Sequence, residues 1–462
     1  MLNRKLAQKS ASGQRSDFSE GKVSGIILRL GLPLMLAELV HVLYSIVDRI
    51  YIGRMPSGGT DALTGLSVCF PLITLIGAFA NLCSTGGATL CTIARGEKDL
   101  KKAERITASA FTLLLLLGVF LTALLYVSAP VTLKWLGGEG KTLKAALSYF
   151  RIYVLGTVPV LISLGMNPFI NAQGFAHVGM TTVLIGAVLN TALDPLFIYA
   201  FGMGLGGAAL ATVLSQTVSA VWVVCFLRGK KPSVRLTALC LDRTVVGGML
   251  KLGATGFTFR VTNSITQAAV NIMLKSWGGA MSALYIGAMG LINSLREITG
   301  LPTNGLTAAG QSVMSFNYGA KQGGRVSQSI RFVLLTSLAV NTLIWALIMA
   351  VPGLLFSPFS SDRALISLTA KCARVYFALF PFMSLQLTGQ STFVALNYPK
   401  HALFFSMLRK IVLVLPLTLL LPGLGLRVMG VFWAEVVSQL VGATACFVTM
   451  YFVIWKKLKA EE

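Results

Sequence analysis

The chain has 462 residues, of which 55% are hydrophobic and only 12% are charged. Soluble domains usually carry about 25% charged residues, so this composition excludes a water-soluble enzyme. The 39 Lys and Arg against 16 Asp and Glu give a formal net charge of +23, which alone would suit a nucleic-acid binder. The apolar content leaves no large polar face for phosphates, so we expect no nucleic-acid partner and a basic excess on one side of a membrane.

Residues 1–25 are polar and basic and lack the apolar stretch and cleavage site of a secretory signal peptide. Beyond them lie twelve apolar segments near the length needed to cross a bilayer, about 20 residues. The predicted helices are 27–52, 62–90, 107–129, 146–168, 179–201, 205–227, 247–274, 282–311, 328–352, 367–394, 402–422 and 428–455.

The segments between these helices alternate between rich and poor in Lys and Arg. The rich set comprises the N-terminal tail, the loops near 95–105, 228–243 and 321–325, Lys400, and the C-terminal lysines. Because cytoplasmic loops carry such an excess, both termini are predicted to be cytoplasmic. The expected regions are a basic tail over 1–25, a six-helix lobe over 26–228, a cytoplasmic linker over 229–246, a second six-helix lobe over 247–455 and a tail over 456–462.

An internal duplication is indicated by four sequence matches at an offset of 222 or 223 residues. The matching pairs are 28–31 with 250–253, 96–98 with 319–321, 151–153 with 374–376, and 207–216 with 430–439. Each half holds an even number of spans, so the repeats enter the membrane from the same side. The predicted fold is all-α and integral to the membrane, with twelve transmembrane helices in two parallel-repeat six-helix bundles around a central cavity.

Five acidic residues fall inside predicted spans, where a charge costs at least about 2.5–3.5 kcal/mol and therefore needs a cavity or a partner. They are Glu38, Asp48, Asp194, Glu297 and Glu435. On the first helix Glu38, His41, Ser45 and Asp48 share one face, and on the fifth Asn190 and Asp194 lie one turn apart.

Together with Thr212 in the small-residue run of the sixth helix, Asp48, Asn190 and Asp194 supply oxygen ligands suited to a small cation. Paired carboxylates also hold a proton, so the pattern predicts a coupling site for Na⁺ or H⁺. The alternative is that Asp48 pairs with adjacent Arg49 and that Asp194 with Pro195 forms a helix-breaking turn. His41 alone is more typical of a packing residue than of a proton carrier.

The second half has a polar stripe of its own, formed by Arg260, Asn263, Gln267 and Asn271. Arg296 and Glu297 follow on the eighth helix, and Gln386 and Gln390 lie one turn apart on the tenth. Glu435 is the repeat counterpart of Thr212. Glu297 and Glu435 could hold a cationic substrate, or Arg260 and Arg296 could neutralise them, and the pattern leaves both interpretations open.

No phosphate-binding G-x-x-x-x-G-K-[ST] loop, H-E-x-x-H or G-x-S-x-G motif occurs in the chain. We therefore expect neither an ATPase, a protease nor a hydrolase, and no cofactor.

The sequence resembles the multidrug and toxic compound extrusion (MATE) family, in particular its MepA/DinF-like bacterial branch. The motifs that carry the resemblance are LYSIVD at 43–48, NAQG at 171–174, LNTALDP at 189–195, GAALAT at 207–212 and FNYGA at 316–320. The resemblance implies a twelve-helix exporter of the bacterial inner membrane that alternates between outward-open and inward-open states, with coupling residues at Asp48, Asn190, Asp194 and Thr212.

Glu38 and His41 depart from the family pattern, and Glu297 and Glu435 match no pattern of the family. Arg409 matches the Arg that is usual in the family at this position. As residues that could contact substrate or protons we name Glu38, His41, Tyr44, Gln267, Asn271, Glu297, Gln386, Arg409 and Glu435.

The function predicted from the sequence is monomeric antiport, in which amphiphilic and cationic organic compounds leave as Na⁺ or H⁺ enters. A flippase for lipid-linked precursors of a related fold is the alternative, because Arg260, Arg296, Arg374 and Arg409 would suit a pyrophosphate headgroup. A membrane receptor or scaffold fits the hydrophobicity but predicts neither the duplication nor the buried acids.

Overall fold

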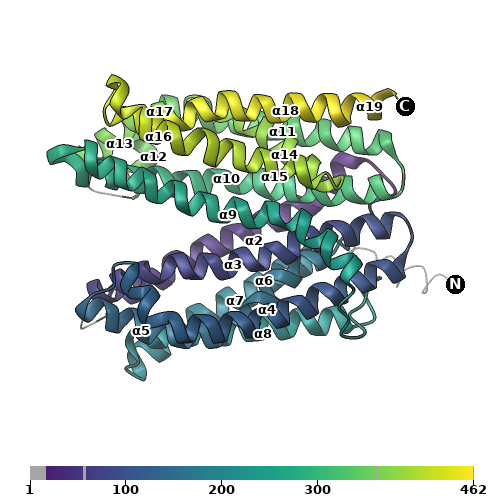
Figure 1. Cartoon of the computed structure of the whole chain (residues 1–462), viewed down its shortest axis with the longest axis horizontal. Coiled ribbons are helices and arrows are strands. Elements are labelled where there is room, and N and C mark those ends of the chain that lie inside the picture. Colours follow the sequence, from purple (N-terminus) through teal and green to yellow (C-terminus); the bar gives the residue numbers. More distant parts are fainter. Residues whose placement is uncertain (1–16, 56–58, 360–361, 461–462) are drawn as a thin grey trace. The chain divides into compact units, whose positions relative to one another are not determined.

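The computed structural model describes residues 17–55, 59–359 and 362–460, and within these ranges all regular elements are helices (Figure 1). Contacts divide the chain into two compact units. The first, called the N unit, comprises Leu32–Phe257 with the described residues up to Glu20; the second, the C unit, comprises Gly21–Gly31 and the chain from Thr258 onward. The division therefore falls within helices, whereas the lobes proposed from the sequence, 26–228 and 247–455, are separated by the segment 229–246.

All twelve predicted spans coincide with helices. The helices of the first half are α2 (Val23–Gly53), α3 (Gly59–Gly96), α4 (Leu100–Trp135), α5 (Gly140–Leu155), α6 (Thr157–Asn171), α7 (Ala176–Pro195), η1 (Leu196–Ala200) and α8 (Gly204–Arg228), and the second half begins with α9 (Arg243–Trp277). Within the N unit α3, α4 and α6 pack against one another, and α6 and α7 pack against α8 (Figure 1). Their core is apolar and includes the fully buried Ile76, Phe150 and Phe169.

The second half continues with η2 (Gly279–Met281), α10 (Ser282–Gly319), α11 (Gly323–Ala350), α12 (Pro352–Phe356), α13 (Arg363–Tyr376), η3 (Phe380–Phe382), α14 (Met383–Ala395), α15 (Pro399–Met407), η4 (Leu408–Val414), α16 (Leu415–Leu420), η5 (Pro422–Leu426), α17 (Met429–Ser438), η6 (Gln439–Ala443), α18 (Thr444–Met450), η7 (Tyr451–Trp455) and α19 (Lys456–Ala460). In the C unit α10 packs against α11, α13 and α14. Phe356, Phe377 and Phe432 are fully buried in its core.

Eight helical segments of the described chain are long and apolar enough to cross a membrane, and two bent pairs raise the number to ten. The bent pairs are α5 with α6, at 60°, and α13 with α14, at 52°. The other two predicted spans are α9 and α10, which are long helices that carry the polar residues of the C unit. The chain is a multi-pass membrane protein.

The backbone confirms the internal duplication. Residues with positive φ are uncommon, so their recurrence at one spacing is informative. Four such pairs lie 223 residues apart: Lys98 (62°) and Lys321 (56°), Gly174 (88°) and Asn397 (60°), Gly202 (64°) and Gly425 (98°), and Gly204 (58°) and Arg427 (46°). The two halves therefore turn their chains at equivalent places.

Two of the sequence motifs shape loops of the fold. The side-chain amide of Gln173, in the NAQG motif, donates to the carbonyl of Val234 at 3.1 Å and accepts from its N–H at 2.9 Å. Asn317, in the FNYGA motif, is fully buried and accepts from Nε of Arg325 at 3.0 Å. These residues fix the ends of helices and the loop before α9.

Asp242 lies immediately before α9 in that same loop. The hydroxyl and the N–H of Thr244 both donate to its carboxylate, at 2.6 and 3.0 Å. The hydrogen bond from the hydroxyl is the largest of the effects that hold the pKa of the Asp242 carboxyl below its ordinary value. Its negative charge also suits the positive end of the helix dipole.

Helices α3 and α9 meet within the N unit through glycines, so that their backbones touch. A Cβ at Gly253 would lie 1.7 Å from the carbonyl oxygen of Leu82, and one at Gly86 would lie 2.0 Å from that of Met249. We expect Gly253→Ala to force the helices apart and to cost about 1–3 kcal/mol of stability, as overpacking does. Thermal unfolding of the purified protein in detergent measures this loss.

Gly247→Ala is the matched control, because it lies on the same helix and a Cβ there meets nothing within 4 Å. Equal melting temperatures for the two variants would contradict the close approach of α3 and α9.

Candidate functional site

The last turn of α7 places two polar side chains inside the N unit. Asp194 is fully buried one residue before the end of the helix at Pro195, and Asn190 lies one turn earlier and is 3% exposed. Nδ2 of Asn190 donates to Oδ1 of Asp194 at 3.3 Å and to the hydroxyl of Thr212 on α8 at 3.3 Å. Asn190 therefore ties α7 to α8 through the predicted coupling residues.

Asp48 reaches the same place from α2. Its carboxyl group and that of Asp194 lie within hydrogen-bonding reach of each other. Two carboxylates in contact repel, so this arrangement requires a proton or a cation between them. One buried oxygen of each group, Oδ1 of Asp48 and Oδ2 of Asp194, receives no N–H or O–H donor from the described residues. The structure thus brings together Asp48, Asn190, Asp194 and Thr212.

Tyrosines surround this acid pair. Tyr44 lies one turn before Asp48 on α2, and Tyr149 of α5 is close enough to Asp48 to interact with it electrostatically. The ring of Tyr149 stacks on that of Tyr153, with centroids 5.8 Å apart. Tyr149 was not a candidate from the sequence, although the repeated Arg151-Ile-Tyr153 motif lies beside it.

The alternative interpretation of the aspartates is only partly correct. The α-helical hydrogen bonding of α7 does end at Pro195, but the chain continues directly into the π-helix η1 without a turn, and Asp194 is buried there beside Asp48. Among the described residues no ion pair joins Asp48 to Arg49, which is exposed. Glu38 and His41 are exposed on α2, and the His41 ring lies 5.0 Å from the Tyr44 ring.

A cation bound at this site would need neutral oxygen ligands in addition to the two carboxylates. In the described part of the chain, no three His, Cys, Asp or Glu side chains gather into a metal-binding group. Asp48 and Asp194 would therefore need Asn190 and Thr212 as further ligands. As placed, Asn190 turns its NH₂ toward Asp194, so a metal ion would require its amide to rotate and present the oxygen.

For the coupling site predicted from the sequence, we expect Asn190→Ala to weaken the dependence of transport on the coupling ion by about tenfold to a hundredfold, because one hydrogen bond to a charged group contributes about 1.5–3 kcal/mol. The measurement is the Na⁺ or H⁺ concentration at half-maximal transport in proteoliposomes. Asn167→Ala serves as the control, since its amide donates to the carbonyl of Gly179 away from the acids. Equal ion dependence in both variants would exclude a role for Asn190.

The C unit contains a second cluster of buried charges. Nη2 of Arg409 lies 2.7 Å from Oε1 of Glu435, and Nζ of Lys410 lies 3.6 Å from its Oε2. The three side chains are only 6–8% exposed. The sequence raised Arg260 and Arg296 as partners of Glu297 and Glu435. The ion pairs of Glu435 form with Arg409 and Lys410, and Arg296 interacts with Glu435 electrostatically at longer range. Glu297 is exposed.

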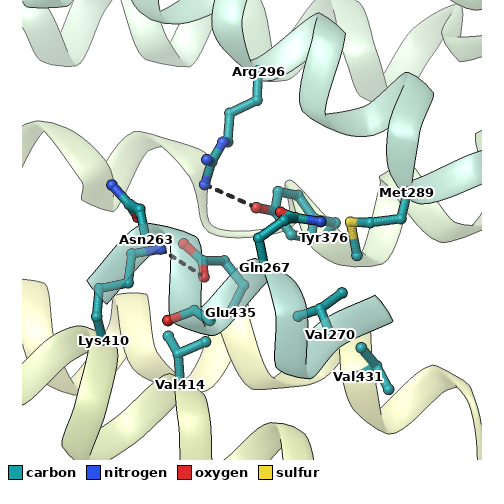
Figure 2. Close-up of a pocket in the computed structure, with 11 residues that line it drawn as sticks. Asn263, Gln267, Val270, Met289, Arg296, Tyr376, Lys410, Val414, Val431 and Glu435 are labelled. Carbon is teal, nitrogen blue, oxygen red and sulfur yellow. Dashed lines mark hydrogen bonds and ion pairs between the residues drawn. The ribbon is translucent and has the colours of Figure 1, made fainter. Parts of the chain in front are cut away.

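A cavity of about 30 Å³ adjoins this cluster (Figure 2). Arg296, Lys410 and Glu435 line it, and Nη1 of Arg296 donates to the hydroxyl of Tyr376 at 3.2 Å. Gln267 also lines it and accepts from Asn293 at 3.1 Å. Lys410 and Tyr376 were not candidates from the sequence, but Lys410 adjoins Arg409 in an otherwise apolar segment and Tyr376 belongs to a repeated motif.

Of the remaining candidates, Asn271 accepts from Gln267 at 3.4 Å and is exposed. Gln386 is buried and donates to Gln390 at 3.3 Å. Several residues of the two clusters are repeat counterparts separated by 223 positions: Tyr44 and Gln267, Asp48 and Asn271, Tyr153 and Tyr376, and Thr212 and Glu435. Equivalent places in the two units thus carry polar side chains, with the acid at position 48 in the N unit and at position 435 in the C unit.

The bundled apolar helices with buried polar clusters are those of a multi-pass membrane transporter. The family model MatE matches residues 33–196 and 260–420. The chain belongs to the MatE family.

Named relatives and solved structures agree with this membership. The multidrug export protein MepA of Staphylococcus saprophyticus is 22% identical over 94% of this chain and 95% of its own length. MepA of Staphylococcus aureus strain NCTC 8325 is also 22% identical, over 94% of this chain and 95% of its own. A crystal structure of MATE in complex with MaL6 matches with a TM-score of 0.88 at 21% identity, covering 95% of this chain and 98% of that one. This likeness shows the fold.

Proposed function

We propose that the chain is a secondary active antiporter that exports amphiphilic organic compounds, cationic ones among them, in exchange for inward Na⁺ or H⁺. The observation that carries the proposal is the contact of Asp48 with the buried Asp194, completed by Asn190 and Thr212. Such a contact holds a proton or a small cation and is costly when empty. The names of the relatives, multidrug export proteins, support the organic substrate class.

In this proposal the ion biases an alternating-access equilibrium. Binding of the ion at the acid pair shifts the equilibrium toward one of the two states. The size of this shift is set by how much more tightly the ion binds that state than the other. The contact between the two carboxyl groups favours a bound proton in the arrangement described here. The same oxygens serve Na⁺ once the amide of Asn190 rotates.

The chain is further proposed to act as a monomer in the bacterial inner membrane, with both termini in the cytoplasm. The support for this orientation is the excess of Lys and Arg in alternate loops. Residues 1–16, which hold four of these cations, lie outside the described residues.

The test is efflux of a fluorescent organic cation from proteoliposomes in which Na⁺ and pH are imposed independently. Export driven by a proton gradient at equal Na⁺ assigns H⁺, and export driven by a Na⁺ gradient at equal pH assigns Na⁺. Export under neither gradient would overturn antiport. The flippase alternative has less support, because the relatives are named as multidrug exporters.

A further inference from the structure

The charges around the cavity of the C unit do not balance. Glu435 is the only carboxylate among the described lining residues, while Arg296 and Lys410 both line the cavity. Arg409 approaches Glu435 from beside the cavity, at 2.7 Å, and so already neutralises it. The exposed Glu297 interacts with Arg296 at longer range but is not part of the lining. The lining therefore keeps an excess of positive charge.

Both cationic groups have hydrogen-bonding capacity left for another partner. Nζ of Lys410 lies 3.6 Å from Glu435, longer than a well-formed N–H···O bond of about 2.7–3.2 Å. Arg296 uses one nitrogen on the hydroxyl of Tyr376, and because that hydroxyl accepts, its own hydrogen remains to donate. Figure 2 shows Arg296, Lys410 and Glu435 reaching from different helices toward the space between them.

The cavity selects its occupant by size and charge. A water needs about 10–15 Å³ of such volume, so about 30 Å³ holds a group of one to three heavy atoms. Lys, Arg and a phenol hydroxyl are all donors, and Arg in particular matches carboxylates. A buried excess of positive charge without a partner is costly.

We infer that this cavity of the C unit, lined by Arg296, Tyr376, Lys410 and Gln267, is a binding site for a small monovalent anion with the size and charge of a carboxylate group. The occupant is either a free anion or the acidic group of a larger compound. The same charges repel ammonium groups, so recognition of cationic compounds falls to the acidic residues of the N unit.

The experiment measures anion binding and does not depend on transport, so it stands apart from the proposed antiport. The purified protein is unfolded thermally in buffer whose only other anion is a bulky sulfonate, while acetate or chloride is titrated in. Binding to the folded state raises the melting temperature along a saturable curve that yields a dissociation constant. Saturation by acetate alone assigns a carboxylate, and saturation by chloride as well assigns small anions generally.

Two substitutions that change the local charge in opposite directions distinguish a binding site from a structural ion pair. We expect Lys410→Met to weaken acetate binding about tenfold and Glu435→Gln to strengthen it about tenfold, since each changes the local charge by one unit. If the ion pair between Lys410 and Glu435 were purely structural, neither substitution would change the dissociation constant for acetate. Lys371→Met is the control, because Lys371 is exposed on α13 outside the cavity.

The inference is overturned if neither anion stabilises the wild-type protein along a saturable curve, or if Lys410→Met binds acetate as the wild type does. Should Glu435→Gln fail to give monodisperse protein, Arg296→Gln replaces it, with weaker binding expected and unchanged binding contradicting the site.

Discussion

Gradient-driven export is expected to disappear when Asp48 and Asp194 are both changed to Asn. The double variant keeps the size of both side chains and removes the charges that hold a proton or a cation in the buried contact. A site that no longer binds the ion cannot couple the ion gradient to the helix rearrangement, whatever the affinity of the protein for its substrate. Efflux in proteoliposomes under an imposed gradient measures the loss, which we expect to be complete within detection.

Folding has to be separated from coupling in this experiment. Because two carboxyl groups in contact repel when ionised, the Asn pair should be at least as stable thermally as the wild type. Glu97→Gln is the matched control, since Glu97 is an exposed acid paired with Lys102 at 2.9 Å. Full export by the double variant would remove the acid pair from the mechanism, and loss of export in the control would indicate a general defect.

The sequence predicted the fold and the polar side chains that lie together in the N unit, because both depend on local patterns. Membrane helices satisfy their backbone hydrogen bonds internally, so apolar length places most of them. Asn190 and Asp194 share a helix face through their spacing, and the cost of burying Asp48 made it a candidate. That the two aspartates touch could not be derived from spacing, because it depends on where tertiary packing places α2 relative to the end of α7.

The basic cluster of the C unit was harder to predict. Lys410 follows Arg409, and neighbours in an α-helix point about 100° apart, so both reaching Glu435 was not expected. Both residues lie in η4, where the helix widens to π-helical bonding. That local widening is set by packing, and sequence periodicity carries no sign of it.

Changing Glu435 to Gln is expected to destabilise the protein by about 3–5 kcal/mol, the usual cost of removing one partner of a buried ion pair. Arg409 and Lys410 would both lose their carboxylate while remaining 6–8% exposed, and Nε of Arg409 already lacks a hydrogen-bond partner among the described residues. The measurement is thermal and denaturant-induced unfolding in detergent, in buffer whose only anion is a bulky sulfonate. Glu297→Gln, an exposed acid on α10, is the control and should change stability by less than about 0.5 kcal/mol.

Two further experiments test whether unpaired charge causes the loss of stability in Glu435→Gln. Replacing all three charged groups, as Arg409→Met, Lys410→Met and Glu435→Leu, should recover most of the lost stability, because well-packed apolar side chains substitute for buried ion pairs at little or no cost. Adding acetate should restore part of the stability of Glu435→Gln alone, since an anion beside Lys410 takes over the role of the carboxylate. If Glu435→Gln were as stable as Glu297→Gln, the ion pairs with Arg409 and Lys410 could not be formed as described, and the excess positive charge at the cavity would lose its basis.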